Sequence, residues 1–168
     1  PGTTTLGQRL RRVLLHERHV LSPLIEALLF IAGRIQLTAQ RIRPALAKGQ
    51  VVVCDRFHDS TVVYQGCGGG LSVPWLDRLG REAIGGLMPD LTLVLDVPPS
   101  VGLRRVTGAK DRMERKALAF HRRVRRGFLT LARREPRRFI VLEGTQPAPK
   151  LHQEIIKLVL RRLTDARR

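Results

Sequence analysis

The sequence is poor in cysteines and aromatic residues and has no long apolar run, and each shortage excludes a class of protein. Its two cysteines, Cys54 and Cys67, cannot build the disulfide framework of a small secreted domain, and they indicate free thiols in a reducing cytosol. Phe, Trp and Tyr make up 4% of the residues, with no RNP-type aromatic pattern. No apolar run reaches the roughly eighteen residues of a membrane span, and the first residues do not resemble a signal peptide. A single globular domain in the cytoplasm is therefore expected.

Acidic residues are also few. There are 14 of them against 31 lysines and arginines, which gives a net charge of +17 and predicts affinity for polyanions. The clearest basic segment is a predicted helix from about Glu114 to just before Pro136. Its arginines spread around the helix and leave Phe120 and Val124 to pack, which favours a solvated face. Zinc-finger spacing and an obvious helix-turn-helix are absent, so a basic nucleic-acid-binding protein remains only the third-ranked reading.

The most informative segment covers residues 50–70 and reads QVVVCDRFHDSTVVYQGCGGG. Its apolar run at 51–54 is typical of a parallel strand covered by helices on both faces. Asp55 and Arg56 follow at the expected carboxyl end of that strand, where open α/β sheets bind ligands. A strand-end salt bridge would by itself explain this pair. Polar side chains spaced to reach a common ligand come next: Ser60, Thr61, Tyr64 and Gln65.

The rest of the chain alternates helical and apolar patterns, as expected for an α/β protein with a parallel sheet. Strands are predicted at 51–54, 92–97 and 138–142. Helices are predicted at 6–15, from Pro23 with Ser22 as N-cap, from Pro44 to Gly49, at 72–85, from Pro98 to Val106, and after Pro147. Phe30 and Arg34 lie four residues apart on one helix face, and packing in the core would be enough to explain Phe30.

The segment DRFHDSTVVYQGCGGGL resembles the DR(Y/F/H)…S(S/T)…YQG…G(R/G)G(L/I) region of bacterial thymidylate kinases. Six further segments are similar to that family in order and spacing: PGTTTLG at 1–7, LLFIAGRIQ at 28–36, IRPALAKG at 42–49, GLMPDLTLVLDV at 86–97, DRME at 111–114 and GTQP at 144–147. The resemblance covers essentially the whole chain. It implies a P-loop NTPase-like nucleoside monophosphate kinase fold, with a parallel sheet flanked by helices.

The resemblance also implies the reaction. Residues 1–168 would form one thymidylate kinase domain that transfers the γ-phosphoryl group of ATP to dTMP, giving dTDP for dTTP biosynthesis, with Mg²⁺. In the family, the residue matching Phe30 stacks on thymine and the residue matching Arg34 holds the base or phosphate. Arg56 would grip the phosphate, while Thr61, Tyr64 and Gln65 would shape the sugar and base pocket. A cytoplasmic homodimer is expected.

The resemblance also implies which residues lie near ATP, the phosphoryl donor. The segment at about 107–116 resembles the mobile lid of nucleoside monophosphate kinases, in which Arg112 would neutralise the transferring phosphoryl group. Gln146 lies in a loop that approaches the adenine of ATP in the family. Asp55 would position Mg²⁺ waters or orient Arg56. Arg112, Asp55 and Arg56 are thus the expected catalytic residues, and no protein metal site is certain.

The sequence departs from the family at its start. Pro1 falls in the middle of the family's EPGGT loop, Thr3 stands where a second glycine is usual, and no G-x-x-x-x-G-K-[ST] phosphate loop occurs. The expectation is that the N-terminal βαβ portion is missing, including a strand between 51–54 and 92–97 in a five-stranded sheet. Residues 1–168 alone would then be marginally stable and inactive. The alternatives are a truncated fragment and a non-catalytic nucleotide-binding relative.

Overall fold

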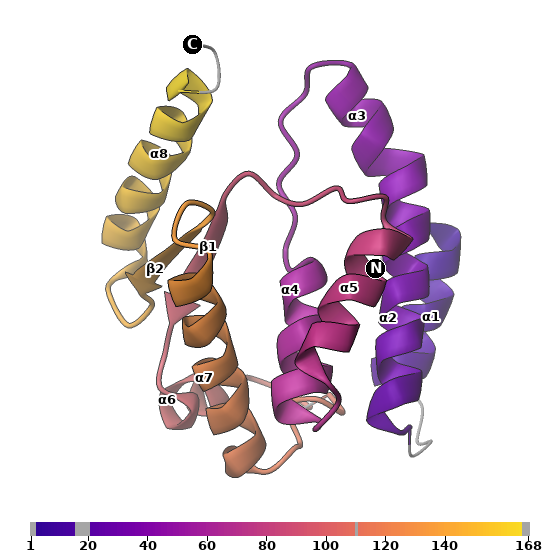
Figure 1. Cartoon of the computed structure of the whole chain (residues 1–168). Helices are drawn as coiled ribbons and strands as arrows, with labels where there is room; N and C mark the ends of the chain where they lie inside the picture. The colour runs from indigo at the N-terminus through magenta and orange to yellow at the C-terminus, as the bar shows by residue number, and fades with distance from the viewer. Residues whose placement is uncertain (1–2, 16–20, 110, 166–168) are drawn as a thin grey trace. The chain divides into compact units, whose positions relative to one another are not determined.

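The computed structural model describes residues 3–15, 21–109 and 111–165 (Figure 1). The chain divides into two compact units, and each is considered by itself. Unit 1 comprises Pro1–Met88 and Thr107–Val124, and unit 2 comprises Pro89–Val106 and Arg125–Arg168. None of the described helices is long and apolar enough to cross a membrane.

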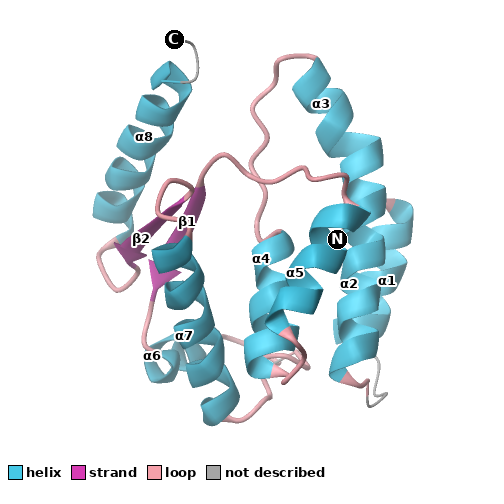
Figure 2. Cartoon of the chain, in the orientation of Figure 1, coloured by secondary structure: helices cyan, strands magenta, loops and turns pink. Residues whose placement is uncertain are grey.

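Unit 1 is built from helices (Figure 2). They are α1 (Thr5–Leu15), α2 (Pro23–Leu37), η1 (Thr38–Ile42), α3 (Arg43–Ala47), α4 (His58–Thr61), η2 (Val62–Gly68), α5 (Val73–Ala83) and the first turns of α7 (Leu118–Arg134). The predicted starts of α2 and α5 are confirmed, because the hydroxyls of Ser22 and Ser72 accept hydrogen bonds from the backbone N–H groups of Ile25 and Trp75.

The core of unit 1 gathers side chains from both ends of its sequence. Leu14, Leu15 and Met113 form a buried cluster, against which Leu21, Leu29, Phe30 and Tyr64 pack. Leu76 of α5 is fully buried, whereas Trp75 in the first turn of the same helix is 37% exposed.

The helices η1 and η2 are π-helical, a feature that the sequence did not predict. Such wider turns are rare and frequently occur at functional sites. Tyr64 and Gln65, two of the expected site residues, lie in η2.

Unit 2 contains a sheet of two parallel strands, β1 (Thr92–Asp96) and β2 (Phe139–Glu143), in the register Thr92 to Phe139 through Asp96 to Glu143. The helices α6 (Pro99–Arg105) and α8 (Ala148–Asp165) and the later turns of α7 complete the unit (Figure 2). The predicted strands at 92–97 and 138–142 and the parallel direction of the sheet are confirmed; the direct pairing of these two strands was not predicted.

The prediction of a strand at 51–54 is wrong for this structure. A β-strand is defined by backbone hydrogen bonds to a neighbouring strand, and residues 51–54 make no such bonds within the described part of the chain. Val53 is 93% exposed and Cys54 is exposed as well, so neither is part of a buried strand. The sheet described has two strands rather than five, and Leu95 in β1 is 47% exposed instead of buried on both faces. The expected missing βαβ portion remains a prediction.

The helix expected from Glu114 begins at Leu118 instead. A closed turn precedes it, in which Oδ1 of Asp111 accepts from the backbone N–H groups of Met113 and Glu114, while Oε2 of Glu114 accepts from the N–H of Asp111. These reciprocal bonds have the pattern of a capping box, and they start a single turn, closed by the N–H of Arg115 bonded to the carbonyl of Asp111, that ends before α7 begins.

Candidate functional site

Arg34 lies in the last turn of α2 and is only 8% exposed. Its Nη2 donates to the carbonyl oxygen of Phe57 at 3.0 Å and to Oγ1 of Thr61 at 2.8 Å. Its Nη1 is buried and has no partner among the described residues. Burial lowers the pKa of Arg34 to about 10, although the nearby Cys54 and Asp59 oppose that shift, so the side chain is still charged at neutral pH.

Arg56 has a left-handed backbone conformation with φ of 64°, which is uncommon for a residue other than glycine. Its guanidinium lies over the ring of Tyr64, 5.1 Å from the ring centroid. The Tyr64 ring meets Phe120 edge to face, with centroids 6.0 Å apart. Cation–π contact thus holds an exposed, positively charged group above η2.

The structure brings most of the expected acceptor-site residues together in unit 1. Arg34 contacts Thr61 directly, and Arg56 contacts Tyr64. Phe30 and Tyr64 both pack against the Leu14 cluster. Two cations, two aromatic rings and a hydroxyl therefore come from α2, from the segment that precedes α4, and from α4 and η2.

Gln65 is 1% exposed, and its Nε2 donates to Oε2 of Glu26 at 3.0 Å. Glu26 itself is 1% exposed and also accepts from Nη1 of Arg112 at 2.8 Å and from Nζ of Lys116 at 3.3 Å. Arg112 further donates from Nε to the carbonyl oxygen of Leu14 at 2.7 Å. Arg112, expected at a phosphoryl group, is in this structure bound to a buried carboxylate.

Sequence reasoning missed Glu26 as the centre of this cluster. The available signal was its position inside the apolar run LIEALLF, where a carboxylate turned inward needs cationic partners.

Sequence reasoning also missed a contact between the buried His58 in α4 and the partly exposed Asp77 in α5. Nε2 of His58 lies 2.9 Å from Oδ1 of Asp77, and the His58 side chain is fully buried. Burial lowers the pKa of His58 despite the opposing Asp77 contact. Burial alone would raise the pKa of Asp77, but hydrogen bonds from His58 and Arg81 outweigh it and lower that pKa.

The remaining expected residues stand apart from these contacts. Asp55 is exposed directly before Arg56. Within the described residues, no group of three or more His, Cys, Asp and Glu side chains could hold a metal ion. Gln146 belongs to unit 2, where its Nε2 donates to Glu154 at 3.3 Å and its buried Oε1 has no partner among the residues described.

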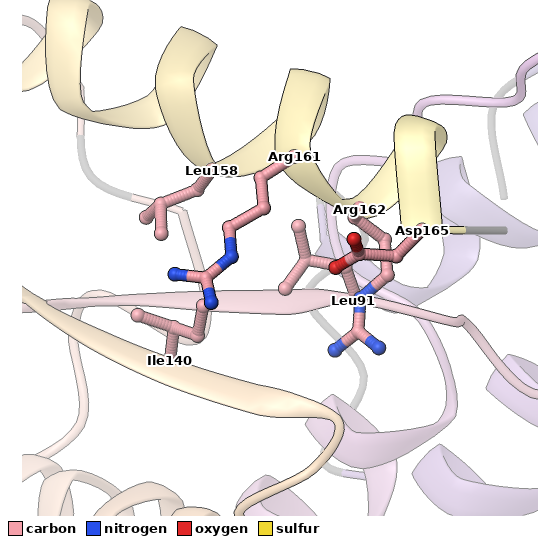
Figure 3. Close-up of a pocket in the computed structure, with 6 residues that line it drawn as sticks. All are labelled: Leu91, Ile140, Leu158, Arg161, Arg162 and Asp165. Carbon is pink, nitrogen blue, oxygen red and sulfur yellow. The ribbon is translucent and has the colours of Figure 1, made fainter. Parts of the chain in front are cut away.

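Unit 2 also has a cavity of about 240 Å³ (Figure 3). Its lining combines apolar and charged side chains from the strand region and α8: Leu91, Ile140, Leu158, Arg161, Arg162 and Asp165. None of the expected site residues lines it.

The arrangement in unit 1 has the chemistry of a site for an anionic ligand with a planar group. A buried guanidinium with an unbonded nitrogen lies near a second, exposed guanidinium and two aromatic rings. The parallel strands of unit 2 and the surrounding helices place the chain in the α/β class.

Comparisons with known proteins name the family. The family model "Thymidylate kinase" matches residues 1–155. A thymidylate kinase of Deinococcus radiodurans is 50% identical over 157 residues, covering 92% of this chain and 76% of the relative. That of Kosmotoga olearia is 43% identical over 159 residues, covering 94% and 76%. The crystal structure of thymidylate kinase from Ehrlichia chaffeensis aligns with a TM-score of 0.76 at 33% identity, covering 95% of this chain and 76% of that one. The chain belongs to the thymidylate kinase family.

Proposed function

We propose that this protein phosphorylates dTMP to dTDP with ATP, and that unit 1 holds the acceptor nucleotide. The observation that carries the proposal is Arg34: its charge is buried, its hydrogen-bonded partners are neutral oxygens, and its Nη1 is unbonded. A buried polar group without a partner costs free energy, which a nucleotide oxygen at Nη1 would recover. Family membership supports dTMP as that nucleotide.

The roles of the other acceptor residues follow from their positions. Phe30 would stack on thymine, and Arg56 would bind the phosphate, since its guanidinium is exposed above Tyr64. Thr61 would act through Arg34, which it orients by accepting a hydrogen bond. Gln65 would act indirectly, because its amide nitrogen is bound to Glu26.

Mg²⁺ suits this reaction because it neutralises the phosphate charge that develops during transfer. A Mg²⁺ ion bound to substrate phosphates needs only one or two carboxylates. Asp55 is an exposed carboxylate beside Arg56 and fits that kind of site, whereas a site made by protein ligands alone has no support among the described residues.

For the donor side, we propose that residues 107–116 act as a lid and that Gln146 approaches adenine. Its buried Oε1 could accept from an amine, which is consistent with that role. Arg112 would have to exchange Glu26 for a phosphoryl oxygen in order to act in transfer. Inactivity of the chain alone, a homodimeric assembly and location in the cytoplasm remain predictions.

Calorimetric titration with dTMP tests the acceptor site without requiring ATP. We expect binding by the chain, and a loss of about tenfold or more in the variant Arg56→Ala, because charge-assisted hydrogen bonds contribute about 1.5–3 kcal/mol. Equal affinity of both proteins would remove Arg56 from the site. In a full-length form, a coupled assay of ADP formation tests transfer, and there Arg112→Ala should lower turnover more than dTMP affinity.

A further inference from the structure

The His58 ring is hydrogen-bonded to α5 through the carboxylate of Asp77, which Arg81 holds in place. Asp77 receives Nε of Arg81 at 2.9 Å on the same Oδ1 that lies 2.9 Å from Nε2 of His58. Arg81 is four residues after Asp77 on the same helix, so this pair orients the carboxylate from within α5.

Gly80 supplies the space for the ring. A Cβ atom at this position would lie 2.2 Å from Cε1 and 2.4 Å from Nδ1 of His58, so the ring could not stay where it is. Glycine in a helix interior is destabilising relative to alanine. The close approach of the imidazole accounts for glycine here.

The helix that His58 begins, α4, continues without a break into η2, so contacts at its first turn fix where this helical segment starts. Arg34 of α2 holds this start by hydrogen bonds to Phe57 and Thr61, and Asp77 of α5 holds it by a hydrogen bond to His58. The charged groups that face His58 are Asp77 and Arg81 from α5, Asp59 from α4 and Arg34 from α2.

Arg56 immediately precedes this fastened segment. Its left-handed backbone is unfavourable and persists only where the surroundings hold it. Only Phe57 separates Arg56 from His58, so a displacement of the His58 backbone would be transmitted to the backbone of Arg56.

We propose that His58 is a positioning residue for the acceptor phosphate: its hydrogen bond to Asp77 fastens the start of α4 to α5 and so holds Arg56 above Tyr64. The proposal rests on the proposed function, which assigns the phosphate of dTMP to Arg56. His58 itself does not touch the nucleotide.

The test compares dTMP with thymidine, which lacks the phosphate. Both ligands are titrated calorimetrically into the unaltered chain and into the variant His58→Leu. Leucine fills the same space with an apolar side chain of similar bulk but has no N–H group for Asp77. We expect dTMP to bind about tenfold more weakly to the variant and the affinity for thymidine to change by less than about threefold. The reason is that the variant displaces Arg56, which binds the phosphate that thymidine lacks.

Two further variants control for packing. Gly80→Ala displaces the ring while favouring the helix, and it should reproduce the selective loss of dTMP affinity. His58→Gln retains a side-chain N–H for Asp77 and should recover most of that affinity. In an Arg56→Ala background, His58→Leu should have no further effect on dTMP, since the group that it positions is gone.

Three results would overturn the proposal: unchanged dTMP affinity in both His58→Leu and Gly80→Ala, equal weakening of thymidine and dTMP, or unfolding of both variants, which would assign His58 to the core alone. Failure of the proposed function gives a different result, because the unaltered chain would then not bind dTMP at all.

Discussion

Arg34 and Arg112 are two largely buried arginines of unit 1, and their partners differ. Arg112 is paired with the carboxylate of Glu26, so its charge is balanced inside the protein. Arg34 donates its hydrogen bonds to a carbonyl and a hydroxyl, and Asp59 supports its charge electrostatically. Each also has one buried nitrogen without a partner among the described residues. The comparison teaches that burial does not distinguish these two arginines, whereas the atoms that accept their hydrogen bonds do.

Breaking the Arg112 pair should have the largest effect on stability. In Arg112→Met, Glu26 keeps a buried charge with Lys116 as its one cationic partner among the described residues, and removal of one member of such a pair costs about 3–5 kcal/mol. Urea denaturation would measure the loss in the free energy of unfolding. Arg122→Met on an exposed turn of α7 is the control and should change it by less than about 0.5 kcal/mol.

The same substitution at Arg34 should give the opposite balance of effects. Arg34→Met removes two hydrogen bonds to neutral oxygens but also removes a buried charge, so the free energy of unfolding should fall by no more than about 2 kcal/mol. Affinity for dTMP should fall by about tenfold to a hundredfold. If Arg34→Met were the less stable variant and Arg112→Met bound dTMP more weakly, the contrast between the two arginines would be reversed.

The pH dependence of the free energy of unfolding tests a second buried group near Arg34, the His58 side chain at the start of α4. The unfolded chain protonates His58 near its ordinary pKa of about 6.5, whereas burial lowers the pKa in the folded chain. The contribution of neutral His58 is therefore complete above about pH 6.5, and the free energy of unfolding should fall by up to about 1.4 kcal/mol per pH unit below it. The slope assigned to this group should disappear in His58→Gln. An identical slope in that variant would assign the titration to another residue.

The smallest effect is expected where an arginine and its carboxylate are both partly exposed. In unit 2, Nε and Nη2 of Arg125 donate to the two oxygens of Asp96 at 2.6 and 2.8 Å, and the side chains are 41% and 22% exposed. Arg125→Ala should cost about 0.2–1 kcal/mol at low salt and less at 1 M salt. The hydrogen bond from Arg125 lowers the pKa of Asp96, so this contribution should be lost as the pH falls below about 3.9. A cost as large as that of Arg112→Met would show that exposure does not separate the two pairs.

Much of the fold was predictable because it depends on short-range chemistry. Ser22 and Ser72 accept bonds from N–H groups three residues later, and the helices that they cap are at the predicted positions. The apolar segments that became β1 and β2 were also identified. The start of α7 was predicted too early because the turn that Asp111 and Glu114 close does not continue into the helix.

The amino-acid sequence by itself determined the family, the order of the elements and the residue types available to the site. Only the tertiary structure decided which of those residues meet. Residues 51–54 can form a strand only beside a neighbouring strand. The left-handed backbone of Arg56 depends on the contacts that the residues after it make with α2 and α5. The partner of Arg112 is a carboxylate 86 residues away in the sequence. Such contacts join segments distant in the chain, and the free energy of a buried charge depends on all of its neighbours, which local patterns do not encode.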